Sequence, residues 1–320
     1  MPVFEVFEDE DGLEEIHARL KDDDAMVRRI AVLDLAESAE PTVIDTLIDC
    51  LKDNAAEVRL EAARSLESFD VPEAAASLAE VLSDSDEAVR KAAAYSMAEF
   101  KNPECAVPLL DVVGHKEAFV RASVLHALKE LRNPAVLGSA LKALADLDPG
   151  VRMEAVGVLG YLKDINALPA LIHATHDPDP KVRRSALGAI AFCGEDLVVD
   201  ALLEGLGDDE WSVREIAAET LGRVGAVSAA TSLMGAMEDS FWQVRVKAAR
   251  SLGQFKSVSA VSALAPSLQH NISNLRKEAA AALGEIAHPD GLPYLKSVED
   301  DPDPDVRKNI RWAIGQIQAA

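Results

Sequence analysis

Apolar residues recur along this chain on a helical spacing that repeats every 31 residues. Counting from an arginine that returns at this interval, position +3 is Ala, Val or Ile in every copy, and position +7 is always Leu, Met or Ile. These two positions share one face of an α-helix, and position +10 adds a third apolar place that includes Cys193. The pattern predicts an amphipathic helix around each arginine and a packing role for Cys193. The arginines are Arg28, Arg59, Arg90, Arg121, Arg152, Arg183, Arg214, Arg245, Arg276 and Arg307.

A second apolar-periodic segment starts near position +13 of each copy. Prolines stand at its first position, as in Pro103 and Pro134, and Asn102 and Asn133 precede them as candidate N-caps. The arginine-bearing helix is marked in the same way, for example by Asp179 before Pro180. Each 31-residue copy is therefore expected to form one helical hairpin.

Hairpins of one length without insertions stack into a solenoid. We therefore expect an all-α, right-handed α-solenoid of ten 31-residue repeats over residues 11–320, preceded by an N-terminal extension, residues 1–10, and without an internal domain boundary. Phe4 and Phe7 are expected to cover the first repeat, and the polar Asn309 and Arg311 to form the outer face of the last one.

The composition excludes some classes of binding partner. There are 32 Lys and Arg residues against 55 Asp and Glu, which gives a formal charge of -23, and such a surface does not gather phosphates. No stretch of 18 apolar residues occurs, and the first residues lack the pattern of a secretion signal. Three widely spaced cysteines favour a reducing compartment. We expect a cytoplasmic protein that binds neither nucleic acid nor membrane.

The repeat carries a recognisable signature in Asp177-x-Asp179-x-x-Val182-Arg183-x-x-Ala186, followed by an aliphatic residue. It resembles the HEAT-like repeat of the phycobilisome-lyase type, and the resemblance extends over essentially the whole chain. It implies a scaffold on which many unrelated functions are built. It also implies that an aspartate six residues before each arginine joins it in a ladder between neighbouring repeats, with a structural role and not a catalytic one. The ladder residues are Asp22, Arg28, Asp53, Arg59, Asp84, Arg90, Asp146, Arg152, Asp177, Arg183, Asp208, Arg214, Asp239, Arg245, Asp301 and Arg307, with His115 and His270 in place of two aspartates.

Catalytic and metal-binding patterns are weak. His173 and His176 lie one helical turn apart, but a zinc site needs further ligands and Asp177 is assigned to the ladder. The sequence contains no His-Glu dipeptide, no G-x-S-x-G motif and no glycine-rich phosphate loop. We therefore expect no metal, no cofactor and no catalytic residue.

The variable surface of the arginine-bearing helices is the remaining candidate site. HEAT-like solenoids usually line a concave groove with this helix, and here its non-core positions mix aromatic, basic and aliphatic residues, as binding surfaces do. Trp211 and Trp242 are expected to stack one repeat apart, and Tyr95, Phe119 and His126 to form a second cluster. The candidate groove residues are Arg29, Leu60, Arg64, Lys91, Tyr95, Phe119, His126, Met153, Arg184, Trp211, Trp242 and Arg250.

Two functions fit this sequence. The first is a non-catalytic adaptor or an assembly or maturation factor that binds another protein in the groove. The second, implied by the resemblance, is a bilin lyase or chromophore-handling protein with a tetrapyrrole-bearing client. That alternative needs an aromatic cavity with a basic residue, for which Arg64, Tyr95 and His126 are the candidates.

Overall fold

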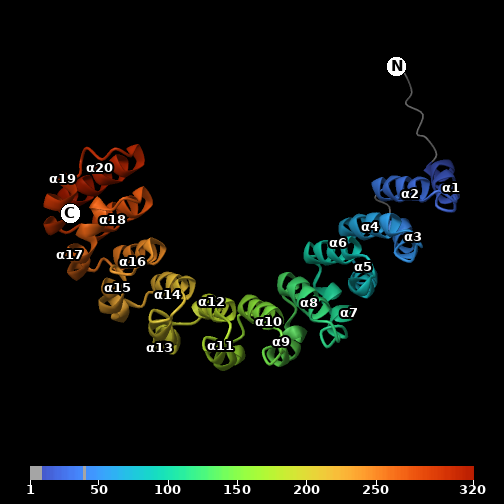
Figure 1. Cartoon of the computed structure of the whole chain (residues 1–320), viewed down its shortest axis with the longest axis horizontal. Helices are drawn as coiled ribbons and strands as arrows, with labels where there is room; N and C mark the ends of the chain where they lie inside the picture. Colours follow the sequence, from blue (N-terminus) through green and yellow to red (C-terminus); the bar gives the residue numbers. More distant parts are fainter. Residues whose placement is uncertain (1–8, 39–40) are drawn as a thin grey trace, which may run out of the picture. The chain divides into compact units, whose positions relative to one another are not determined.

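The computed structural model describes residues 9–38 and 41–320. It is built from α-helices, α1 to α20, joined by short 3₁₀ turns and loops, and no β-strand occurs within these ranges (Figure 1). The prediction of an all-α fold is confirmed. The chain comprises two compact units, Met1–Leu162 and Lys163–Ala320. Phe4, Phe7 and most of the predicted extension lie outside the described residues, and α1 begins at Asp9.

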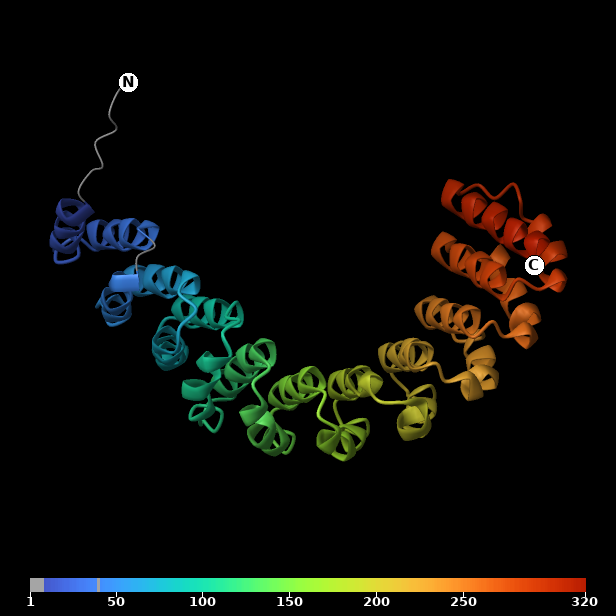
Figure 2. The same ribbon diagram turned by 180° about the vertical axis from the view of Figure 1, so that it is seen from behind.

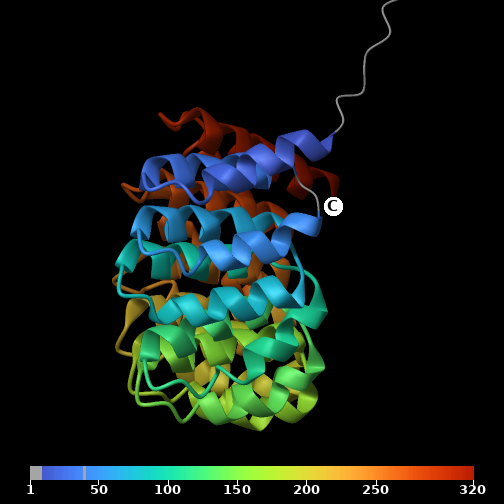
Figure 3. The same ribbon diagram turned by 90° about the vertical axis from the view of Figure 1, so that its right-hand side faces the viewer.

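In the first unit, the helices form two layers. The helices that carry the recurring arginines, here called the motif layer, are α2 (Ala25–Glu37), α4 (Ala56–Ser65), α6 (Glu87–Ala98), α8 (Ala118–Leu131) and α10 (Pro149–Leu162). Opposite them lies the short-helix layer of α1 (Asp9–Arg19), α3 (Ile44–Cys50), α5 (Pro72–Glu80), α7 (Ala106–Leu110) and α9 (Leu137–Ala143). Each motif helix packs on the next, and successive helices, coloured blue to green, follow one another through the unit (Figure 3).

The second unit repeats this arrangement (Figure 2). Its motif layer contains α12 (Pro180–Ala189), α14 (Trp211–Val224), α16 (Trp242–Gln254), α18 (Ser273–Ile286) and α20 (Pro304–Ala319). Its short-helix layer contains α11 (Leu168–Ala174), α13 (Glu195–Gly205), α15 (Ala230–Ala236), α17 (Val261–Leu264) and α19 (Leu292–Lys296). The residues at positions +3 and +7 lie between the layers, where nearly all of them are buried.

The predicted caps set the helix starts. The Asp179 side chain accepts the Lys181 N–H at 2.8 Å, with Pro180 in the first turn, and Asn133 accepts the Ala135 N–H at 3.0 Å. The segment that starts at position +13 differs from a plain helix, because in most repeats its first turn is 3₁₀, as in Pro134–Val136 before α9. The tighter turn satisfies the first N–H groups of a short helix.

Glycines at position +8 of the second unit allow neighbouring motif helices to approach closely. A Cβ added at Gly253 would lie 2.9 Å from the Cα of Ala282, and one added at Gly284 would lie 2.8 Å from the Cα of Ala313. Gly315, at the same position in α20, has no atom within 4 Å of such a Cβ. The helices therefore pack at a spacing that only glycine permits at the first two positions.

Candidate functional site

Bidentate ion pairs connect consecutive repeats at one edge of each unit. Arg183 donates from Nε and Nη2 to the two carboxylate oxygens of Asp208, at 2.7 and 2.8 Å, and from Nη1 to the carbonyl of Asp177 at 2.9 Å. The Asp208 carboxylate also accepts the backbone N–H of Glu210 at 2.9 Å. Each such Arg–Asp pair, here called a rung of the ladder, thus connects three backbone segments and two charges. Such rungs include Arg28–Asp53, Arg59–Asp84, Arg121–Asp146, Arg183–Asp208, Arg214–Asp239 and Arg276–Asp301.

The rungs shift the ionisation of their carboxylates. The hydrogen bond from Arg28 lowers the pKa of Asp53 against the opposing effect of burial. Burial by itself would raise the pKa of Asp208, but the hydrogen bonds from Arg183 and from the Glu210 N–H outweigh it, and the net shift is downward. The paired aspartates are therefore ionised at neutral pH.

Other ladder residues also bond to the backbone of the loops. Arg90, Arg152 and Arg307 each donate from Nη1 to a carbonyl of their own loop, at 2.8, 2.9 and 2.6 Å. The carboxylates of Asp22 and Asp177 accept the N–H group two residues further along, at 2.8 Å in both.

The two histidine positions differ from each other. His115 accepts the Glu117 N–H at 3.2 Å, whereas His270 lies 3.2 Å from Nη2 of Arg245.

A second set of ion pairs, which sequence reasoning missed, crosses the surface of the motif layer. Arg250 donates to both carboxylate oxygens of Glu278 at 2.8 Å, and His126 lies 3.1 Å from the Glu154 carboxylate. Both pairs join position +5 of one repeat to position +2 of the next, a spacing of 28 residues. Glutamates at position +2 were the available signal. Arg29 is paired as well, with Glu61 at 2.8 Å.

The other predicted groove residues lie on the motif layer with differing exposure. Tyr95 is 74% exposed and Phe119 is 41% exposed. A chromophore wall would be buried, so the exposure of Tyr95 does not favour the bilin alternative. Arg64, Lys91 and Arg184 are exposed, and Leu60, Met153, Trp211 and Trp242 are half-buried.

The expected aromatic pair forms with a different partner. Trp211 stacks on Phe241, with ring centroids 5.5 Å apart and an interplanar angle of 15°, and the Arg214 guanidinium lies 5.8 Å from the Phe241 centroid. Phe241, not Trp242, is therefore the ring that lies against Trp211. The reason is position, because Trp242 starts α16 and Phe241 is the extended N-cap residue before it.

Exposed apolar residues form a stripe on α2 of the first unit. Met26, Ile30 and Leu33 are 53%, 45% and 37% exposed, and their spacing places them on one face of the helix. Tyr95 of α6 occupies the same repeat position as Leu33. The motif layer of the first unit thus presents apolar side chains that no other described element covers.

A pocket of about 540 Å³ opens on the motif layer of the second unit, between α18 and α20. Trp312, 44% exposed, forms one wall, and Lys277, Glu285 and Lys308 contribute charges of both signs. Burial and the neighbouring Glu278 raise the pKa of Glu285. The pocket combines an aromatic wall with polar groups, as recognition sites for side chains do.

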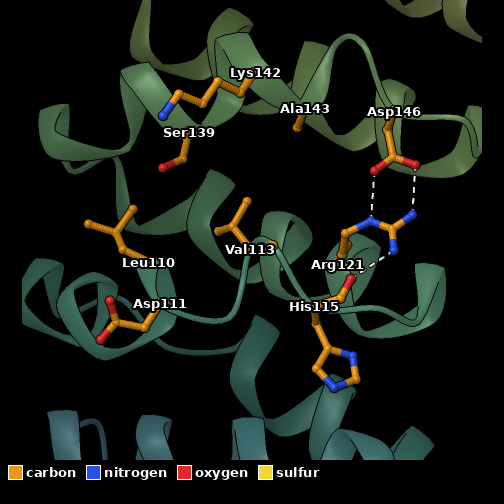
Figure 4. Close-up of a pocket in the computed structure, with 10 residues that line it drawn as sticks. Leu110, Asp111, Val113, His115, Arg121, Ser139, Lys142, Ala143 and Asp146 are labelled. Atoms are coloured by element: carbon orange, nitrogen blue, oxygen red, sulfur yellow. Dashed lines mark hydrogen bonds and ion pairs between the residues drawn. The ribbon is translucent and has the colours of Figure 1, made fainter.

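Clefts also occur along the ladder. One of about 640 Å³ lies between α7 and α9, where the Arg121–Asp146 rung forms one wall and His115, Lys142 and Asp111 lie around it (Figure 4). His176, from the predicted histidine pair, is 2.9 Å from Glu204 at a similar cleft. Within residues 9–38 and 41–320, no three His, Cys, Asp or Glu side chains gather as a metal site would require, and no helix is long and apolar enough to cross a membrane.

The sequence matches the family model for HEAT repeats over residues 13–98, 78–140, 139–222, 168–240 and 230–315. The chain is a HEAT-repeat protein. The matching model is the general HEAT repeat, so the phycobilisome-lyase subtype and the bilin-lyase alternative gain no support from it. A comparison with curated proteins finds no match.

Solved structures with the same fold include two karyopherins. Kap121p, bound to the extreme C-terminus of the protein phosphatase Cdc14p, has a TM-score of 0.66 at 14% identity over 99% of this chain and 42% of its own. Kap95p, in a complex with RanGDP, has a TM-score of 0.65 at 16% identity over 96% of this chain and 50% of its own. An engineered protein has a TM-score of 0.53 at 22% identity over 96% of this chain and 98% of its own. At these identities the likeness shows the fold alone, an α-solenoid.

Proposed function

We propose that this HEAT-repeat protein is a non-catalytic cytoplasmic scaffold, an adaptor or assembly factor, in which residues 11–320 act as one solenoid and the motif layer holds a segment of another protein. The observation that carries the proposal is the pocket beside Trp312, together with the exposed stripe on α2. Both lie on the motif layer, which the sequence predicts to line a binding groove.

The charges of this layer support a protein ligand of mixed character. Arg29 and Arg250 are each neutralised by a glutamate of the next repeat, and His126 lies beside Glu154, so the layer has no unbroken run of positive charge. Exposed aromatic and aliphatic side chains, such as Tyr95 and Met26, lie on the same layer. Such a surface favours a ligand that offers apolar anchors and a few polar contacts over a polyanion.

Comparative capture tests the proposal. We expect a Tyr95→Ala/Phe119→Ala/Trp312→Ala variant to lose a protein that the wild type captures from native lysate, since exposed aromatic anchors contribute most of the energy of such interfaces. The matched control removes exposed apolar groups from the short-helix layer, in Val107→Ala/Leu197→Ala, where the two side chains are 62% and 55% exposed.

The two variants must be folded by circular dichroism before capture is compared. Loss of the partner in the first variant and its retention in the control support the motif layer. Equal retention, or loss in both, contradicts the proposed surface. If a variant in which only Trp312 is replaced binds the partner with unchanged affinity, the pocket is not part of the binding surface. The first unit is then the binding surface.

A further inference from the structure

Three clefts occupy equivalent places along the ladder, and in one of them the arginine lacks its carboxylate. The first contains Arg121 and Asp146, the second Arg183 and Asp208, and in both the bidentate pair forms part of the cleft wall. The third, of about 320 Å³, lies in the second unit between α15 and the 3₁₀ segment Ala265–Gln269, where Arg245 faces His270. The first two clefts are therefore internal references for the third.

The hydrogen bonds around His270 leave donors facing one another. The Ile272 N–H donates to Nδ1 of the imidazole at 3.1 Å, the same bond that a ladder aspartate accepts from the residue two places further along. A neutral imidazole that accepts at Nδ1 carries its proton on Nε2. That Nε2 lies 3.2 Å from Nη2 of Arg245, which is also a donor, so no acceptor stands between them.

The Nε atom of Arg245 shows the same deficit. It is buried and has no hydrogen-bond partner. In the six Arg–Asp rungs named above, the corresponding Nε donates to a carboxylate oxygen at 2.6–2.8 Å. A buried donor without an acceptor costs the free energy of its lost hydration.

The charges around this cleft favour an anion over a cation. Burial, Arg245 and Arg276 together lower the pKa of His270, so the imidazole is neutral at pH 7 and the positive charge of Arg245 is not balanced within its rung. Arg276 is itself paired with Asp301 at 2.7 Å. Glu238 is the acidic side chain that lines the cleft, and it is exposed. A ligand with a single negative charge fits this balance better than a polyanion.

We propose that the cleft at Arg245 and His270 binds the carboxylate of a ligand with an apolar tail. A carboxylate oxygen in the cleft, beside Arg245 Nη2 and His270 Nε2 and at hydrogen-bond distance from each, accepts from both and supplies the acceptor that the rung lacks. Met234, Met237 and Pro266 line the same cleft and provide an apolar wall for the tail. The ligand is a free fatty or amino acid or the C-terminal carboxylate of a peptide, and both present the same chemistry. The inference does not rest on the scaffold function proposed above.

Calorimetric titration of the full-length protein tests this site with two acids and their neutral counterparts. The probes are sodium hexanoate and hexanamide, and N-acetyl-Gly-Leu as the free acid and as its C-terminal amide. We expect wild type to bind at least one acid, with a dissociation constant on the order of 1 mM, and neither neutral probe. Binding of hexanoate identifies free acids as the source, and binding of the dipeptide acid alone identifies a peptide C-terminus.

His270→Asp is the decisive variant, because it restores the carboxylate found in the Arg–Asp rungs. We expect it to raise the thermal midpoint and to weaken binding of the acids by roughly ten- to a hundredfold. Asp208→Asn, which alters the sister cleft, is the control and should bind the acids as wild type does. If His270→Asp binds the acids with unchanged affinity, or if wild type binds neither acid, the proposal is wrong.

Discussion

Replacing Arg183 by alanine tests whether the ladder stabilises the fold. Arg183 makes two bonds to Asp208, at 2.7 and 2.8 Å, and two to the carbonyls of Asp177 and Pro178, at 2.9 and 3.2 Å. The two charged side chains are only 19% and 12% exposed. Breaking one partner of a buried pair costs about 3–5 kcal/mol. Because Asp208 keeps its bond from the Glu210 N–H and some water access, we expect a loss of about 2–4 kcal/mol.

The neighbouring Arg184→Ala provides the control. Arg184 is exposed, and its replacement removes the same charge and a similar side chain, so we expect a change within about 0.5 kcal/mol. Urea unfolding followed by circular dichroism measures the difference, and hydrogen exchange shows whether it is concentrated in α12 and α14. Equal midpoints for the two variants would refute a stabilising ladder. A loss for Arg183→Ala that Arg183→Lys fully restores would show that charge matters and the bidentate geometry does not.

Three further predictions follow from packing and ionisation. Gly253→Ala should be less stable than Gly315→Ala by about 1–3 kcal/mol in urea unfolding, because the new methyl group meets the Ala282 backbone in the first variant and open space in the second. The ladder aspartates such as Asp208 have lowered pKa values, so their contribution to stability should be complete above about pH 4 and be lost as pH falls below it; a flat acid-unfolding profile between about pH 5 and pH 2 would contradict this. Burial and the Asp70 carboxylate raise the pKa of the Cys105 thiol to about 12, so a disulfide reagent at pH 8 should modify it far more slowly than in the urea-unfolded chain, and equal rates would be inconsistent with its burial.

The helices were predictable because their signals are local. Position +3 and +7 residues define a buried face within a single helix, and caps such as Asp179 act over two residues. The sequence also has a glycine at position +8 of several repeats, among them Gly222, Gly253, Gly284 and Gly315. What the pattern did not reveal was that Gly253 meets a neighbouring backbone whereas Gly315 does not, since this depends on whether a further helix packs there.

The candidate site was predicted less completely. The sequence nominated Trp211 and Trp242 as a stacked pair, but a ring's position depends on how each chain segment enters its helix, and Phe241 lies against Trp211. The pocket beside Trp312 exists only because α18 and α20 pack side by side.

The amino-acid sequence by itself determined the repeat and its helices, because these follow from the spacing of residues along one chain, and its resemblance to HEAT-like repeats indicated the ladder positions. The tertiary structure decided which groups meet across repeats. It placed Glu278 against Arg250, joined Arg183 to Asp208, and left Arg245 facing a histidine with a buried donor unpaired. The physical reason is that hydrogen bonds and ion pairs depend on distances of a few tenths of an ångström, and stacking of one hairpin on the next sets those distances.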